Sequence, residues 1–144
     1  MKKYLYPLIF CLTGLFISCE NESDPDPGVT KKARIEFFAK SDFSDPKYEN
    51  HYVQFNAAVM KMTYDPYATE YILDETTEWI AFKDIPKAGN AMVFEVEAPG
   101  IHIKNQTVVM GYSYVIKIGD FTEFHSRNEY VDDRKSEETL QAIF

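Results

Sequence analysis

The sequence predicts an all-β fold: a single antiparallel β-sandwich of about six to eight strands, which follows a cleaved signal peptide and a disordered tether. Three observations support this prediction. Several segments alternate apolar and polar residues with a period of two, as strands with one buried face do. Turn-forming residues separate these segments. No segment repeats its apolar residues with the period of a convincing amphipathic helix.

The first half of the domain contains three predicted strands. Residues 33–40 alternate apolar and mainly polar side chains, which indicates a strand with one buried face. Residues 53–64 begin in the same way, but the apolar phase changes at Ala57-Ala58, which predicts a β-bulge at that pair. Residues 78–82 are apolar on both faces, as expected for a central strand of a sandwich.

Four more strands are predicted in the second half. Residues 92–98 alternate cleanly, residues 107–118 are apolar on both faces, and residues 121–131 provide one more strand or half of a hairpin. Residues 136–144 fit either a short helix or a final strand, and we favour the strand in this context. Turn signals fall between the segments, at Asp45-Pro46, Asp65-Pro66, residues 86–90, Pro99-Gly100 and Gly119-Asp120.

The N-terminus has the organisation of a secretory signal peptide. Two lysines precede an uncharged apolar stretch at residues 5–17, which is too short to span a bilayer, and Ser18-Cys19 follows. We therefore expect a signal peptide at residues 1–18, a lipidated Cys19 with a flexible acidic tether at residues 19–31, and the sandwich domain at residues 32–144. An ordinary cleaved signal with an incidental cysteine is the alternative.

The residues Phe16-Ile17-Ser18-Cys19 resemble a relaxed bacterial lipobox, and the acidic run after the cysteine resembles that of Bacteroidota outer-membrane lipoproteins. The resemblance implies that Cys19 carries acyl chains, palmitate among them, and anchors the protein in the outer membrane. It also implies display at the cell surface, with the periplasmic face as the alternative. The strand pattern of the domain resembles immunoglobulin-like or transthyretin-like modules, without a motif that separates the two.

Charge and cysteine content exclude several function classes. The chain has 23 acidic and 15 basic residues, and loss of Lys2 and Lys3 with the signal peptide changes its net charge from −8 to −10. Phosphate backbones would repel such a chain, so we expect no nucleic-acid partner. Cys11 leaves with the signal peptide and Cys19 is acylated, so the domain has neither a disulfide nor a thiol nucleophile.

Motifs that would indicate an enzyme are not found. His51, His102 and His125 are far apart and show no spacing typical of metal ligands, and the chain has no GxSxG or Ser-x-x-Lys motif. The loop pairs Asp42/Asp45 and Asp132/Asp133 are weak calcium candidates. Asn105-Gln106-Thr107 is formally a glycosylation sequon, without expected meaning in a bacterial protein. We expect a non-enzymatic protein without a metal or other cofactor.

Aromatic residues give the best indication of a binding site. Tyr64, Tyr67 and Tyr71 flank the Asp65-Pro66 turn, and Trp79 follows on the next predicted strand. Exposed rings beside polar side chains can stack on sugars, and Tyr and Trp also anchor protein partners. We expect a lipid-anchored binding or accessory protein of the cell envelope that engages a protein partner or membrane complex. The alternative is a carbohydrate-binding surface lipoprotein of a glycan-uptake system, with these four residues as its ligand contacts.

Overall fold

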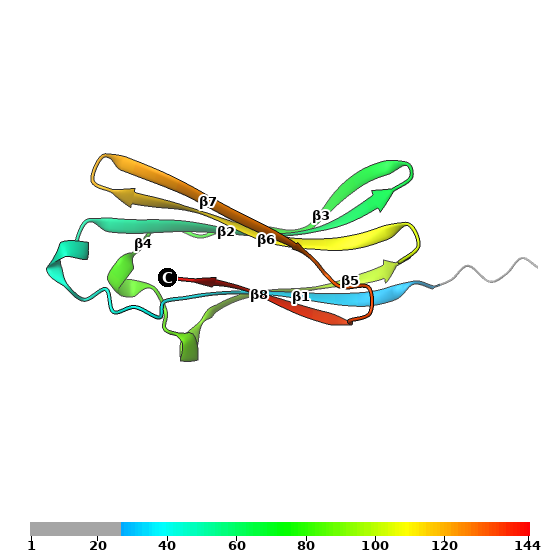
Figure 1. Cartoon of the computed structure of the whole chain (residues 1–144), viewed down its shortest axis with the longest axis horizontal. Helices are drawn as coiled ribbons and strands as arrows, with labels where there is room; N and C mark the ends of the chain where they lie inside the picture. Colours follow the sequence, from blue (N-terminus) through cyan, green and yellow to red (C-terminus); the bar gives the residue numbers. More distant parts are fainter. Residues whose placement is uncertain (1–26) are drawn as a thin grey trace, which may run out of the picture.

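The computed structural model describes residues 27–144, and it shows two β-sheets packed face to face (Figure 1). The predicted β-sandwich is therefore confirmed. The elements are β1 (Val29–Phe38), η1 (Pro46–Tyr48), β2 (His51–Tyr64), β3 (Tyr67–Thr76), β4 (Ile80–Ala81), η2 (Phe82–Asp84), η3 (Ala88–Asn90), β5 (Met92–Ile101), β6 (Gln106–Ile118), β7 (Phe121–Tyr130) and β8 (Glu137–Ile143).

The larger sheet has five strands and the smaller one has three. The order in the larger sheet is β3-β2-β6-β7, with β4 pairing to the first residues of β2, and all of its pairs are antiparallel. The smaller sheet has the order β5-β1-β8. Its β1–β8 pair is parallel, which differs from the fully antiparallel arrangement that the sequence predicts. The chain crosses between the sheets after β7, and β8 then runs beside β1 in the same direction.

The core lies between the two sheets and is built by the alternation that the sequence shows. Along β2, Val53, Phe55, Ala57 and Val59 are all buried, while the residues between them face outward. The rings of Phe37 in β1 and Phe55 in β2 stack with their centroids 4.4 Å apart, which joins the two layers. The last residues form a strand as predicted, because β8 buries alternate residues along β1.

Two strands of the larger sheet differ from the prediction. The central strand expected at residues 78–82 is reduced to β4, a two-residue edge strand, because the chain turns into η2 and buries Phe82 in the core. In contrast, the sequence gives no signal for β3, a strand of ten residues. Its side chains are mostly exposed on both faces, so burial does not require its residues to alternate between apolar and polar.

The irregularities in the sheets also lie at positions other than those predicted. The register shift of the β2–β3 pair falls between Val59 and Met60 and leaves Ile72 of β3 unpaired, so the bulge expected at Ala57-Ala58 is not found there. Pro99-Gly100 is not a turn between strands. The pair forms a bulge within β5, which tolerates proline because it is an edge strand, and Gly100 adopts a φ of 66°.

The N-terminal boundary also differs from the expectation. β1 begins at Val29, so the last three residues of the expected tether belong to the sandwich. Lys31 is the reason, because its side chain is buried and bonded within the domain. The predicted signal peptide and the lipidated Cys19 lie outside the described residues. Within residues 27–144, no helix has the length and apolar character needed to cross a membrane.

Candidate functional site

Three of the four aromatic residues proposed from the sequence lie close together. Tyr64 at the end of β2 and Tyr67 at the start of β3 are paired across the hairpin, and Tyr71 lies further along β3 on the same face. Their exposed fractions are 53%, 71% and 62%, so all three rings face solvent. The connection between the two strands is the predicted Asp65-Pro66 turn.

Trp79 is not part of this group. It precedes β4, which pairs with the start of β2, whereas Tyr64 ends that strand. Eleven residues of strand at ~3.3 Å each separate the two places by about 36 Å. Trp79 is 44% exposed and lines a separate pocket of about 220 Å³ with Tyr52 and Lys117.

The structure adds Tyr130, which the sequence analysis missed. The strand register places Tyr71, Met60, Val109 and Tyr130 side by side across β3, β2, β6 and β7. Paired residues point to the same face of a sheet, and Val59 next to Met60 faces the core, so this row faces outward. Tyr130 is 63% exposed. We call the outward surface that carries Tyr64, Tyr67, Tyr71 and Tyr130 the tyrosine face.

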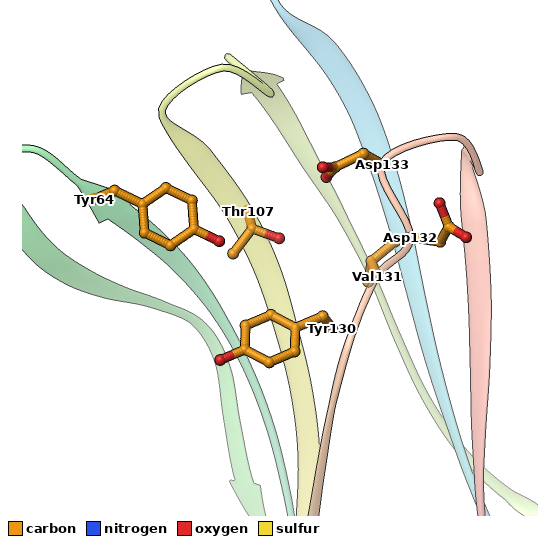
Figure 2. Close-up of a pocket in the computed structure, with 6 residues that line it drawn as sticks. All are labelled: Tyr64, Thr107, Tyr130, Val131, Asp132 and Asp133. Atoms are coloured by element: carbon orange, nitrogen blue, oxygen red, sulfur yellow. The ribbon is translucent and has the colours of Figure 1, made fainter.

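A pocket of about 320 Å³ opens on the tyrosine face near the end of the sheet. Figure 2 shows the rings of Tyr64 and Tyr130 on two sides of Thr107, with the Tyr64 hydroxyl pointing toward Thr107. Asp132 and Asp133, which follow β7, form the opposite rim. Two ring faces and oxygen-bearing side chains therefore border one opening.

The Asp132–Asp133 rim is fixed from beneath by Lys31. Only 3% of Lys31 is exposed, and its ammonium group donates hydrogen bonds to the carbonyls of Asp132 at 3.0 Å, Asp133 at 2.8 Å and Lys135. An ammonium group has three donors, so this buried charge is fully satisfied. The loop that crosses between the sheets is thereby held at the edge of the pocket.

The two carboxylates on this rim have different surroundings. The side chain of Arg134, followed by its backbone N–H, donates to Asp132 and lowers the pKa of this carboxyl to about 2. Figure 2 shows the Asp133 carboxylate directed toward the opening between the strands, and no side-chain partner binds it among the described residues. Asp133 is therefore the carboxylate that a ligand in this pocket would meet.

Asn105 fixes the hairpin that carries Tyr64 and Tyr67. Its side-chain amide donates to the Asp65 carbonyl at 3.0 Å and accepts from the Asp65 N–H at 3.0 Å. The Tyr64 N–H also donates to the Asn105 carbonyl at 2.9 Å. Asn105, which the sequence marks only as part of a sequon, thus joins the β5–β6 turn to the tip of the β2–β3 hairpin.

The outward face of the smaller sheet has a different character. Glu95 in β5 pairs with Lys32 and Arg34 of β1, each at 3.0 Å, and Arg34 also pairs with Glu36 at 2.8 Å. Hydrogen bonds from Lys32 and then Arg34 lower the pKa of Glu95, and those from Arg34 and then Gln141 lower the pKa of Glu36. The charges of this face satisfy one another, whereas the tyrosine face carries exposed rings without a ring partner among the described residues.

Histidines and loop carboxylates do not converge on a site. His125 pairs with Glu123 at 2.8 Å, whereas His51 packs beside the ring of Phe82 and His102 is exposed in the β5–β6 turn. Within the part of the chain that the structure describes, no three histidine or acidic side chains are placed to hold a metal ion.

The carboxylates of Asp42 and Asp45, which the sequence suggests as calcium ligands, accept hydrogen bonds from residues of their own loop. Asp42 accepts hydrogen bonds from the N–H and hydroxyl of Ser44, which lower its pKa. Asp45 caps η1 through the Lys47 N–H.

Comparison with known proteins finds no relative: no protein-family model, curated protein or solved structure matches the chain.

Proposed function

We propose that this protein is a lipid-anchored, non-enzymatic binding protein of the bacterial cell envelope, and that the tyrosine face is its binding surface. The observation that carries the proposal is the exposure of four tyrosines from three strands on one face. Monomeric proteins rarely leave such a group of large rings in water unless it contacts a partner. Aromatic residues at the centre of an interface contribute much of the binding energy.

The anchor half of the proposal rests on the signal peptide and the lipobox-like residues that end at Cys19. Nine residues lie between Cys19 and Val29 at the start of β1, and the ten residue-to-residue steps at ~3.3 Å each span at most about 33 Å. Two or more acyl chains give stable membrane attachment, whereas one chain gives only marginal binding. The chain enters the sandwich at the end that carries the β2–β3 and β5–β6 turns (Figure 1).

Two classes of occupant are compatible with an aromatic surface of this kind. The first is a protein partner or membrane complex, for which the lipoprotein would be an accessory subunit. The second is a glycan, in a surface lipoprotein of a glycan-uptake system. The observation that favours the second is the pocket between Tyr64 and Tyr130, which combines ring faces with oxygen-bearing side chains.

A Cys19→Ala variant tests the anchor. Wild type is expected to have an acylated mature N-terminus by mass spectrometry, to fractionate with membranes and to be cleaved by protease added to intact cells. The variant is expected in the soluble fraction without lipid. If both forms are soluble and Cys19 carries no lipid, the anchored placement is wrong.

A photo-crosslinking residue at position 71 tests the binding surface, with the same residue at position 141 on the opposite sheet as the matched control. We expect intact cells to give a discrete crosslinked product from position 71 and none from position 141. Equal products from both positions would show that the tyrosine face is not selective.

A further inference from the structure

We infer that the tyrosine face binds a neutral oligosaccharide whose chain runs across the strands over Gly111. This inference rests on the proposed function and names the chemical class of the ligand. It depends on two adjacent rows of outward side chains, one with rings at its ends and one with hydrogen-bonding groups. A sugar offers the matching pair of surfaces, since its C–H groups pack on ring faces and its hydroxyls need polar partners.

The ring row supplies the stacking surface. Tyr71 and Tyr130 lie at its two ends, with Met60 and Val109 between them. Three interstrand spacings of ~4.8 Å place the two tyrosine backbones about 14 Å apart, which suits a short oligosaccharide. None of the tyrosines of this face stacks on another ring among the described residues, so their faces are free for a ligand.

The polar row is the next one along the strands. Asp74, Ala58, Gly111 and Asn128 lie side by side across the same four strands, about 7 Å from the ring row. Ala58 and Gly111 form a low floor between two polar ends. At the β3 end, Asn56 donates a hydrogen bond to Asp74 at 2.8 Å, which orients this carboxylate.

Gly111 determines how the other end of the polar row is built. A Cβ at position 111 would lie 1.9 Å from Oδ1 of Asn128, so only glycine lets the Asn128 amide lie down over β6. The Asn128 side chain has no hydrogen-bond partner among the described residues, and it is exposed. Glycine within a central strand often marks a close approach of this kind. An amide without a partner thus lies on the floor of the face, beside the ring row.

The charges of this face favour a neutral glycan over an anionic one. Asp74 lies in the polar row, Asp133 borders the pocket beside Tyr130, and the chain as a whole carries a net charge of −8. Uronate or sulfate groups would be repelled by these carboxylates, whereas neutral hydroxyls can donate hydrogen bonds to them.

The same geometry disfavours a protein partner as the occupant of this row. Protein interfaces have an apolar core surrounded by a polar rim. Here the polar row, with Asp74 and Asn128 at its ends, adjoins the ring row instead of surrounding it. A protein that covered both rows would bury the Asp74 carboxylate, which has a side-chain partner in Asn56 alone, and the Asn128 amide, which has none among the described residues, and this burial is costly.

Affinity electrophoresis of the full chain, purified in detergent, tests the inference. The gels contain the neutral polysaccharides xyloglucan, mannan or amylose, with anionic polygalacturonate as the comparison. We expect retardation by at least one neutral polysaccharide and none by polygalacturonate. Calorimetry with oligosaccharides of the retarding polymer then gives the affinity.

The variants are chosen to separate ring stacking from folding. Tyr71→Leu and Tyr130→Leu keep apolar cover on the sheet but remove the flat ring, and each is expected to weaken binding at least tenfold. Asn128→Ala is expected to weaken it severalfold, and Tyr71→Phe to retain it. Trp79→Leu, an exposed ring at the far end of the same sheet, is the matched control and should leave affinity unchanged.

Three outcomes would overturn the inference: no retardation by any neutral polysaccharide, retardation only by polygalacturonate, or binding that the Tyr71 and Tyr130 variants do not affect. Its failure is distinguishable from failure of the proposed function. If no neutral glycan binds but position 71 still crosslinks selectively on intact cells, the tyrosine face is a binding surface with a different occupant.

Discussion

Replacing Lys31 with Met tests whether one buried ammonium group holds the connection between the two sheets. The loop of residues 131–136 carries the chain from β7 to β8, and three of its carbonyls accept hydrogen bonds from Lys31. Methionine has nearly the same shape along its stem, so it retains the apolar contacts of the side chain and removes only the charged donor.

The expected loss of stability follows from these contacts. Hydrogen bonds from a charged group contribute about 1.5–3 kcal/mol each, but the three are not additive, and water can reach the exposed side of the loop. We therefore expect the free energy of unfolding to fall by about 3 kcal/mol, out of a typical total of 5–15 kcal/mol. With an m value of about 1.5 kcal/mol/M, the urea midpoint should fall by about 2 M.

Urea unfolding followed by far-ultraviolet circular dichroism measures this change. Lys40→Met is the matched control, because it makes the same change in charge at an exposed lysine whose ammonium group has no partner among the described residues. Lys31→Arg should give an intermediate loss, since a planar guanidinium cannot place its donors as an ammonium does. A midpoint for Lys31→Met within about 0.3 M of the Lys40→Met control would refute the reasoning.

Three further predictions concern other parts of the sandwich. The pKa of Asp132, lowered from 3.8 to about 2 by Arg134, means that this carboxylate stabilises the folded state above pH 3.8 and loses that contribution as the pH falls toward about 2. Arg134→Ala should raise the pKa of Asp132 toward 3.8 in an NMR titration, and an unchanged midpoint would contradict the assignment. His51→Phe should raise the melting temperature by about 2–4 °C, because the buried Nδ1 of His51 has no hydrogen-bond partner; a lower melting temperature in calorimetry would argue against this. Phe144→Ala should lower the free energy of unfolding by about 2–4 kcal/mol in urea, since the ring of Phe144 packs at 4.7 Å from that of Tyr114; a loss below about 1 kcal/mol would show that this packing is weak.

The sequence predicted the strands whose two faces differ. Residues 33–40 and 92–98 alternate because one face of each strand lies against the core and the other faces water, and both became strands of the smaller sheet. β3 could not be found in this way, because most of its side chains are exposed on both faces. The two-residue β4 was predicted too long, since an apolar run does not show where the chain leaves the sheet.

Only part of the tyrosine face could be predicted from the sequence. The Asp65-Pro66 turn placed Tyr64 and Tyr67 side by side, because a short hairpin brings its flanking residues together. Tyr130 could have been found by the same reasoning. The Gly119-Asp120 turn pairs Ile118 with Phe121, and counting back along both strands places Tyr130 opposite Val109. Its relation to Tyr71 still required the pairings of β6 with β2 and of β2 with β3, which join segments far apart in the chain.

The period of two in apolar residues was enough to predict the β-strands, because it follows from the alternating geometry of a single strand and needs no knowledge of its neighbours. The folded domain was needed to show which strands pair, that β1 and β8 run parallel, and that Lys31 is buried under a loop about a hundred residues away. It also separated Trp79 from the tyrosines and set the Asn128 amide over Gly111. These features depend on long-range register, which is fixed when both sheets bury their apolar faces together and is not encoded in any one segment.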